Sequence, residues 1–179
     1  MTESTSINKK TRRDFLILTA GAMGSIGTAG LIWPFVNSLR PAADTRALST
    51  LEVNLDPIIK GQAITVMLQG KPVFIRHRTP EEIHNAQKED LTTLIEPEKD
   101  ESRFKKNPQW LIVVGVCTHL GCVPLGQKPT DPRGDYNGWF CPCHGSHYDI
   151  SGRIRKGPAP RNLPVPPYIF ITDNVIRIG

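Results

Sequence analysis

All four cysteines of the chain lie in one window, residues 117–147, together with three of its five histidines. The window opens with the sequence CTHLGC at 117–122 and closes with CPCHGSH at 141–147. Thiolate sulfur and imidazole nitrogen are ligands that proteins use for zinc ions and for iron–sulfur clusters. Each box offers a cysteine, a histidine and a further cysteine. The window therefore predicts an inorganic centre with four ligands, and two cysteines are not needed as ligands.

The candidate ligands are Cys117 and His119 from the first box and Cys141 and His144 from the second. One tetrahedral zinc ion with two cysteines and two histidines is the simplest interpretation. Zinc fingers, however, usually group the cysteines on one arm and the histidines on the other. In a Rieske centre, two cysteines hold one iron of a [2Fe–2S] cluster and two histidines hold the other. That arrangement fits the mirrored boxes better than a single ion does.

The two boxes resemble those of the Rieske iron–sulfur subunit of ubiquinol–cytochrome c reductase, the bc-type respiratory complex, in its bacterial form with a twin-arginine signal. The resemblance continues through Gly157-Pro158-Ala159-Pro160 and covers essentially the whole chain from Arg12 onward. It implies one [2Fe–2S] cluster, with the two cysteine ligands on the inner iron and the two histidine ligands on the outer, solvent-facing iron.

The resemblance also implies that the two non-ligand cysteines, Cys122 and Cys143, form a disulfide between the two loops. Thiols that lie outside the cytoplasm, beside an oxidising centre, are expected to be paired. Two free structural thiols are the alternative. By the same resemblance, the loop 157–160 would shield the cluster and help it dock at the quinol site. The alternative is that this loop is only an irregular connection into the last hairpin.

Two further residues are implied to bond the cluster, Ser146 to a bridging sulfide and Tyr148 to a ligand sulfur. Such donors raise the potential of a metal centre. Turn chemistry after Gly145 and ordinary packing are the respective alternatives. The resemblance implies that His144 hydrogen-bonds the quinol and accepts its proton, because an imidazole on iron can still exchange its outer proton. His147 is expected to be a structural neighbour rather than a ligand.

The N-terminal segment predicts export and anchoring. Arg12 and Arg13 precede an uncharged run from Phe15 to Leu39, as in a twin-arginine signal; an ordinary positive flank is the alternative. About 22 helical residues span about 33 Å, enough for a bilayer core. Residues 14–39 are therefore expected to be a retained anchor rather than a cleaved signal, with residues 1–13 in the cytoplasm and the head in the periplasm.

Residues 40–50 have the composition of a flexible tether, and residues 51–179 are expected to form the head. Apolar residues alternate with polar ones or gather in short β-rich runs, which predicts strands. These runs lie at 51–55, 63–67, 72–75, 110–114, 168–171 and 175–178, and a short helix begins after Thr79. The predicted fold is mainly β: a small antiparallel β-sandwich with a cluster-binding subdomain inserted at about 115–160, preceded by one transmembrane helix.

The resulting hypothesis is a subunit of a quinol–cytochrome c reductase in the cell inner membrane, an electron carrier by itself. It would accept an electron and a proton from ubiquinol and pass the electron to a c-type cytochrome subunit, thereby contributing to proton translocation. The implied partners are that subunit, the cytochrome b subunit and ubiquinol, in a dimeric complex. An exported electron-transfer subunit of a periplasmic oxidase is the alternative. The net charge of +5 is dispersed, without a basic cluster or a nucleic-acid-binding motif, so no nucleic-acid partner is expected.

Overall fold

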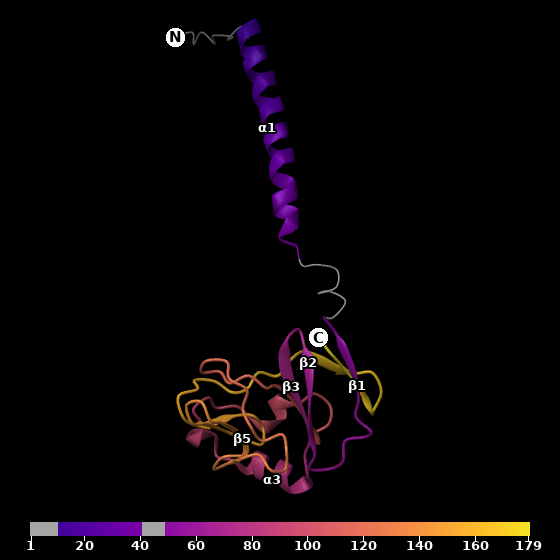
Figure 1. The fold of residues 1–179 in the computed structure, drawn as a ribbon, viewed down its shortest axis with the longest axis vertical. Coiled ribbons are helices and arrows are strands. Elements are labelled where there is room, and N and C mark those ends of the chain that lie inside the picture. The colour runs from indigo at the N-terminus through magenta and orange to yellow at the C-terminus, as the bar shows by residue number, and fades with distance from the viewer. Residues whose placement is uncertain (1–10, 41–48) are drawn as a thin grey trace, which may run out of the picture. The chain divides into compact units, whose positions relative to one another are not determined.

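The computed structural model describes residues 11–40 and 49–179 (Figure 1). The chain divides into two compact units, residues 1–46 and 47–179, and each is described by itself. The predicted tether at 40–50 falls almost entirely on residues 41–48, which lie outside the described residues, as do residues 1–10.

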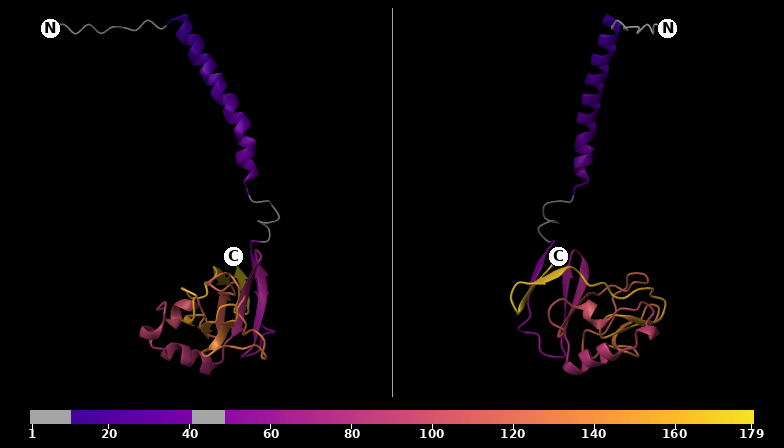
Figure 2. Two further views of the ribbon diagram at one scale, coloured as in Figure 1. Left: turned by 60° about the vertical axis from the view of Figure 1, so that its left-hand side comes forward. Right: turned by 180° about the vertical axis from the view of Figure 1, so that it is seen from behind.

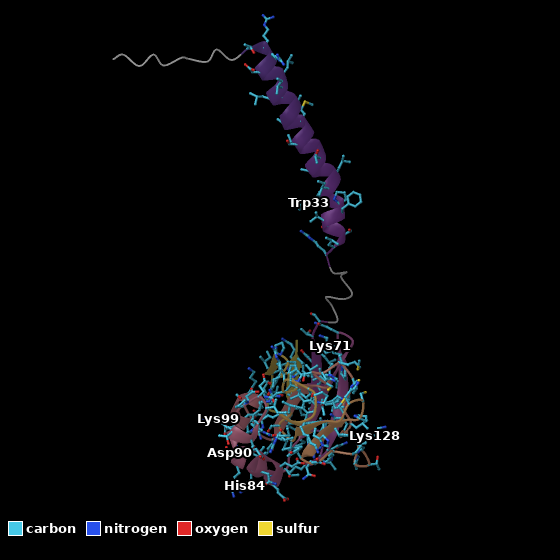
Figure 3. The ribbon with its side chains drawn as sticks, turned by 90° about the vertical axis from the view of Figure 1, so that its left-hand side faces the viewer. Trp33, Lys71, His84, Asp90, Lys99 and Lys128 are labelled. Atoms are coloured by element: carbon cyan, nitrogen blue, oxygen red, sulfur yellow. The ribbon has the colours of Figure 1, made fainter. Side chains whose placement is uncertain are left out.

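The N-terminal unit contains one long helix, α1, from Arg12 to Ser38. Thr11 caps its first turn: the Thr11 hydroxyl accepts from the backbone N–H of Asp14, and the Asp14 carboxylate accepts from the N–H of Thr11. The helix has a mean hydropathy of 1.7 in its most apolar stretch and is long enough to cross a bilayer. Trp33 projects from the helix near its C-terminal end (Figure 3). A signal sequence near the N-terminus meets the same criteria.

The head contains a sandwich of two antiparallel sheets. The order of strands in the first sheet is β1-β9-β8, and in the second it is β2-β3-β4. The strands span Leu51–Asn54 (β1), Ala63–Leu68 (β2), Lys71–His77 (β3), Trp110–Val114 (β4), Tyr168–Phe170 (β8) and Val175–Ile178 (β9). Because β1 pairs with β9, the first and last strands of the head lie side by side (Figure 2). The predicted sandwich is confirmed.

The sheet β2-β3-β4 separates two apolar cores. Along β3, Val73 and Ile75 pack into the core shared with the first sheet, whereas Phe74 packs into the core of the cluster-binding subdomain. On β4, Ile112 faces the first core and Val113 faces the second. Successive side chains of a strand point to opposite faces, so the continuous apolar runs at 72–75 and 110–114 supply both cores.

Between β3 and β4 the chain forms short helices. The helix α3 runs from Pro80 to Lys88, with Thr79 as its N-cap and Glu82 completing a capping box, as the sequence predicts. Single 3₁₀ turns follow at Leu91–Thr93 and Asp100–Arg103. Neither turn is among the elements that the sequence analysis locates.

The inserted subdomain is more regular than its glycine and proline content suggests. It contains a third antiparallel sheet, β5-β6-β7, formed by Asn137–Cys141, Ser146–Asp149 and Ile154–Lys156. Trp139, Tyr148 and Ile154 from this sheet pack against Phe74 of β3. The second box of the cysteine window thus joins β5 to β6, while the first box follows directly after β4.

Candidate metal centre

The two boxes of the window adopt matching turns. The backbone N–H of Gly121 donates to the carbonyl of Cys117 at 3.0 Å, and the N–H of Gly145 donates to the carbonyl of Cys141 at 3.0 Å. Both glycines have positive φ values, 84° and 74°, in the region that glycine adopts without a steric penalty. Each turn therefore returns the chain toward its first cysteine and presents a histidine on the way.

Cys117 and Cys141 have buried side chains that interact with each other. Burial raises the pKa of the Cys141 thiol to about 12, and the neighbouring Cys117 adds to that rise. For Cys117, burial acts in the same direction but is outweighed by hydrogen bonds, chiefly from the Tyr148 hydroxyl, which lower the pKa of the thiol. The two sulfurs thus lie together in a buried pocket that favours a thiolate at Cys117.

The histidines of the two boxes meet at the same place. The rings of His119 and His144 lie edge to face, with centroids 4.6 Å apart. Nδ1 of His119 is buried and finds no hydrogen-bond partner among the described residues. A buried imidazole nitrogen without a partner is costly unless it binds something. A [2Fe–2S] cluster of the Rieske type is held by two cysteines and two histidines. The site offers this donor set: two buried sulfurs, the unpartnered nitrogen of His119 and the imidazole of His144.

The two non-ligand cysteines, Cys122 and Cys143, lie beside the ligand candidates. Ligand atoms of Cys122, Cys141 and Cys143 all lie within 4.8 Å of one another, a grouping that could itself hold a metal ion. All four cysteines are free thiols in the described head. The neighbouring Cys143 thiol raises the pKa of Cys122, so Cys122 is poorly prepared to act as a thiolate ligand. The disulfide between Cys122 and Cys143 stays a prediction, as does the choice of ligands.

Tyr148 and Ser146, the predicted donors, both lie at the centre. The Tyr148 hydroxyl, on a side chain with no exposed surface, donates to Cys117 Sγ at 3.3 Å. Ser146, in the second box, is buried, with 1% of its surface exposed. Ser146 Oγ in turn accepts the backbone N–H of Ala159 at 3.2 Å. The Tyr148 hydroxyl therefore points at a ligand sulfur, whereas the Ser146 hydroxyl contacts the predicted cover loop, and its bond to a cluster sulfide stays a prediction.

The loop 157–160 lies directly on the second box. A Cβ added to Gly157 would lie 2.5 Å from the carbonyl oxygen of Gly145 and 2.6 Å from Cα of Ser146, so the two backbones touch. Ala159 is buried, and Pro158 and Pro160 are exposed. Beyond the prolines, Thr118 Oγ1 donates to the carbonyl of Arg161 at 2.7 Å and thereby joins the loop to the first box. The loop therefore contacts both boxes, and its role as a cover of the cluster stays a prediction.

His147 lies outside this arrangement. Its Nδ1 accepts the backbone N–H of Asp135 at 3.1 Å, and its ring lies 4.8 Å from that of Phe140. An imidazole nitrogen that accepts from the backbone is already satisfied. This contact supports the structural role expected for His147.

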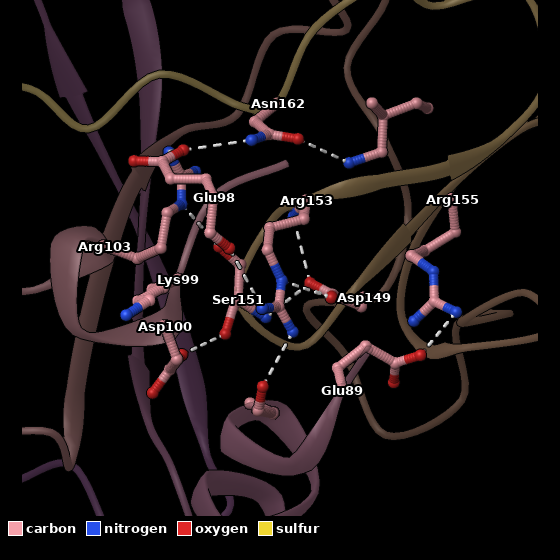
Figure 4. A network of polar contacts seen from close by, with 12 residues as sticks. Glu89, Glu98, Lys99, Asp100, Arg103, Asp149, Ser151, Arg153, Arg155 and Asn162 are labelled. Atoms are coloured by element: carbon pink, nitrogen blue, oxygen red, sulfur yellow. Dashed lines mark hydrogen bonds and ion pairs between the residues drawn. The ribbon is translucent and has the colours of Figure 1, made fainter. Parts of the chain in front are cut away.

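A buried polar network behind the centre is not foreseen from the sequence (Figure 4). It joins the segment 96–103 to the turn after β6 through ion pairs and hydrogen bonds. Its fully or nearly buried members are Arg78, Asp100, Arg103, Asp149, Ser151, Arg153 and Asn162. In the sequence these residues look like polar residues of an exposed loop, because several of their partners lie far away along the chain, as for Arg78, whose partners Asp100 and Ser151 are 22 and 73 positions away.

Comparisons with known proteins place these observations in a family. Residues 57–167 match the model of the Rieske [2Fe-2S] domain. Residues 2–42 match a second model, described as the TAT signal of the ubiquinol–cytochrome c reductase Fe-S subunit, so Arg12 and Arg13 lie within a matched export signal. The two models together cover both units of the chain.

Individual relatives agree. A protein of Rhodospirillum rubrum named ubiquinol–cytochrome c reductase iron-sulfur subunit is 58% identical over 178 residues, which is 99% of this chain and 97% of the relative. The mitochondrial Rieske subunit of the cytochrome b-c1 complex of Saccharomyces cerevisiae is 53% identical over 92% of this chain and 75% of its own. A chain of a solved hyperthermophilic respiratory Complex III is 26% identical with a TM-score of 0.52, over 88% of this chain and 97% of that one.

The matched domain carries a Rieske [2Fe–2S] cluster, and the donor set described above fits it. The chain therefore belongs to the Rieske iron–sulfur family, among the members named iron-sulfur subunit of ubiquinol–cytochrome c reductase.

Proposed function

We propose that this chain is the iron–sulfur subunit of a membrane-bound quinol–cytochrome c reductase, in which its head takes an electron and a proton from a quinol. The observation that carries the proposal is the asymmetry of the two histidines. His144 is exposed, whereas Nδ1 of His119, whose ring lies against that of His144, is buried and orphaned. An exposed imidazole at the edge of a redox centre is a contact point for a substrate that must lose a proton with each electron.

Cys117 and Cys141 would hold the inner iron, and His119 and His144 the outer one. When bound, a Rieske cluster accepts one electron at about −150 to +300 mV, because neutral imidazoles replace two thiolates. His144 would receive the quinol hydroxyl as a hydrogen bond at its outer nitrogen and hold the proton there. Buried surroundings at the sulfurs exclude water from the other side of the centre.

The surface around His144 supports docking of an apolar partner. Leu120 and Val123, in and after the first box, expose 69% and 52% of their surface. An exposed apolar patch beside a functional group marks an interaction site. We expect this surface to enter the quinol pocket of the cytochrome b subunit, and the Cys122–Cys143 disulfide would keep the two loops together as it does so.

The N-terminal segment would place the chain in the membrane. Residues 14–39 would anchor the chain, residues 40–50 would tether the head, and residues 51–179 would carry the electron between the cytochrome b subunit and the c-type cytochrome. Lys9, Lys10, Arg12 and Arg13 would keep the N-terminus in the cytoplasm and leave the head in the periplasm. The dimeric complex, not this chain alone, would oxidise ubiquinol and translocate protons.

The test is purification of the complex from membranes that contain the full-length chain. We expect the chain to co-purify with b- and c-type haems and to show the low-temperature EPR spectrum of a Rieske cluster. His144→Ala should abolish both the EPR signal and quinol oxidation. A chain that leaves the membrane with a periplasmic oxidase and without b-type haem would contradict the proposal.

A further inference from the structure

Asn162 lies just beyond the cover loop and is almost completely buried, with 4% of its surface exposed. Its side chain uses every hydrogen-bonding group that an amide has. Oδ1 accepts the backbone N–H of Ile154 at 2.9 Å, and Nδ2 donates to the carbonyl of Glu96 at 3.2 Å and to Glu98 Oε2 at 3.0 Å. A buried amide with all its partners in place is fixed in one orientation.

The backbone of Asn162 is held as well. Its N–H donates to Glu96 Oε2 at 2.6 Å, a charge-assisted bond. The next residue, Leu163, donates its N–H to the carbonyl of Gly152 at 2.8 Å, and its own carbonyl accepts from the Arg103 guanidinium. The segment 96–103 therefore holds the chain that leaves the cover loop at Asn162 and Leu163. Figure 4 shows the contact between Asn162 and Glu98.

Glu98, the carboxylate that accepts from Asn162, is itself fixed by hydrogen bonds from Arg103 and Ser102. Arg103 Nη1 donates to Glu98 Oε2 at 2.9 Å, and Arg103 Nε donates to the carbonyl of Ser151 at 3.0 Å. Ser102 Oγ donates to Glu98 Oε1 at 3.0 Å. The carboxylate that receives Asn162 is thus part of a network and not a freely moving surface side chain.

From Asn162 a short path leads to the metal centre. Ala159, three residues before Asn162, donates its N–H to Ser146 Oγ, and both residues are buried. A serine hydroxyl has one proton to give. Because Ser146 Oγ accepts from the loop, the direction of that proton depends on where the loop holds the Ala159 amide. Ser146 belongs to the second box and is 1% exposed, so its hydroxyl lies within the buried surroundings of the centre.

We propose that Asn162 is a positioning residue, which fixes the loop 157–160 and through it the direction of the Ser146 hydroxyl at the metal centre. The inference rests on the proposed function, because it takes Ser146 to be a donor to the bound cluster. It also gives a role to the segment 96–103: this charged stretch sets the redox properties of a centre that it does not touch.

The test is a double-mutant cycle read by EPR-monitored redox titration of the cluster-loaded full-length chain in its membranes. Loss of a well-aligned hydrogen bond costs about 1.4 kcal/mol, so Ser146→Ala should lower the affinity of the centre for its electron about tenfold. Asn162→Ala, which only misdirects the bond, should lower it about threefold. The double variant should match Ser146→Ala alone, because Asn162 acts through Ser146.

The matched control is Asp100→Asn. Asp100 is equally buried in the same segment, and among the described residues it bonds Arg78 and Ser151. It should destabilise the head while leaving the potential unchanged. If Asn162→Ala does not accumulate, Glu96→Ala provides the second variant, because it removes the acceptor of the Asn162 N–H from a half-buried side chain. Its shift should be smaller, in the same direction, and absent when Ser146 is already alanine.

The outcomes separate this inference from the proposed function. An unchanged potential in Ser146→Ala would contradict the donor role of Ser146 and with it the site assignment. A shift in Ser146→Ala with no shift in either Asn162→Ala or Glu96→Ala would overturn the positioning role alone. Additive shifts in the double variant would overturn it too, because Asn162 would then act by another route.

Discussion

The sandwich and the cluster-binding subdomain of this head are stabilised in different ways. The sandwich core is almost wholly apolar, with Ile75, Ile112, Ile176 and Ile178 completely buried between the sheets. The subdomain has an apolar core against Phe74, but it is tied to the rest of the head by buried charges such as Arg78 and Asp100, neither of which has exposed surface. Apolar packing tolerates small shifts, whereas paired charges specify one geometry. The half that holds the centre is thus the half with fixed polar geometry.

The largest expected effect comes from removing a ligand. Cys141→Ser should abolish the cluster, because a serine hydroxyl does not replace a thiolate on iron–sulfur clusters. The Rieske EPR signal should disappear while the circular dichroism of the sandwich remains. The matched control is Cys143→Ser, the exposed cysteine of the same box, which should retain a cluster that is lost more readily. Equal loss in both variants would contradict the assignment of ligands.

Breaking a buried ion pair should be the next largest effect. Arg78 donates to Asp100 with both guanidinium ends, at 2.6 and 3.2 Å. Asp100→Ala leaves a buried, unpaired guanidinium and should lower the free energy of unfolding by about 3–5 kcal/mol. Chemical denaturation of the membrane-free or detergent-solubilised chain measures this. The exposed pair of Lys106 and Asp173 is the control, since solvent screens this pair and Asp173→Asn should leave the free energy of unfolding nearly unchanged.

A small change in the sandwich core should act on stability alone. Ile75 has no exposed surface, and Ile75→Val should cost about 1 kcal/mol in the free energy of unfolding. The midpoint potential should not move, because Ile75 faces the core away from the subdomain. A shifted potential in this variant would mean that the sandwich and the cluster-binding subdomain are mechanically coupled.

Tyr148→Phe should shift the midpoint potential and have little effect on the stability of the fold. It removes the hydroxyl that donates to Cys117 Sγ, yet it keeps the buried ring. Loss of one hydrogen bond to sulfur, worth about 1 kcal/mol, corresponds to a potential lower by roughly 40 mV for one electron. Redox titration measures this shift, and the EPR signal should retain its full intensity. An unchanged potential would rule out Tyr148 as a donor to the cluster.

The smallest effect concerns acid stability. Burial tends to raise the pKa of Glu98, but hydrogen bonds from Asn162 and the charge of Arg103 outweigh it, so the pKa lies below its usual value of 4.5. A carboxyl with a lowered pKa stabilises the fold above its unfolded value and loses that contribution as the pH falls through the folded value. Glu98→Gln should therefore flatten the loss of stability below about pH 4.5, in denaturation curves taken across that range. An unaltered pH profile would remove Glu98 from the network.

Much of the architecture could be predicted because local signals were strong. The period of apolar residues located the strands of the sandwich, and Thr79 with Pro80 located α3. The strands β5, β6 and β7 were not predicted, because glycines and short polar stretches at 137–156 conceal their alternation and a register shift interrupts the pairing. Tertiary packing against Phe74, and not local preference, makes this region a sheet.

The chemistry of the centre can be inferred from the residue types alone. Cysteine and histidine at mirrored spacings allow few metal sites, and the ligand types restrict the cluster, the redox range and the coupling to a proton. The buried polar groups behind the centre, in contrast, are recognisable only in the fold. Asn162, Glu98 and Asp100 look like ordinary loop residues until the fold brings together segments more than 50 positions apart, as when Asn162 meets Glu98. Ligand identity is a local property of the chain, whereas the direction of a hydrogen bond depends on where distant backbones are held.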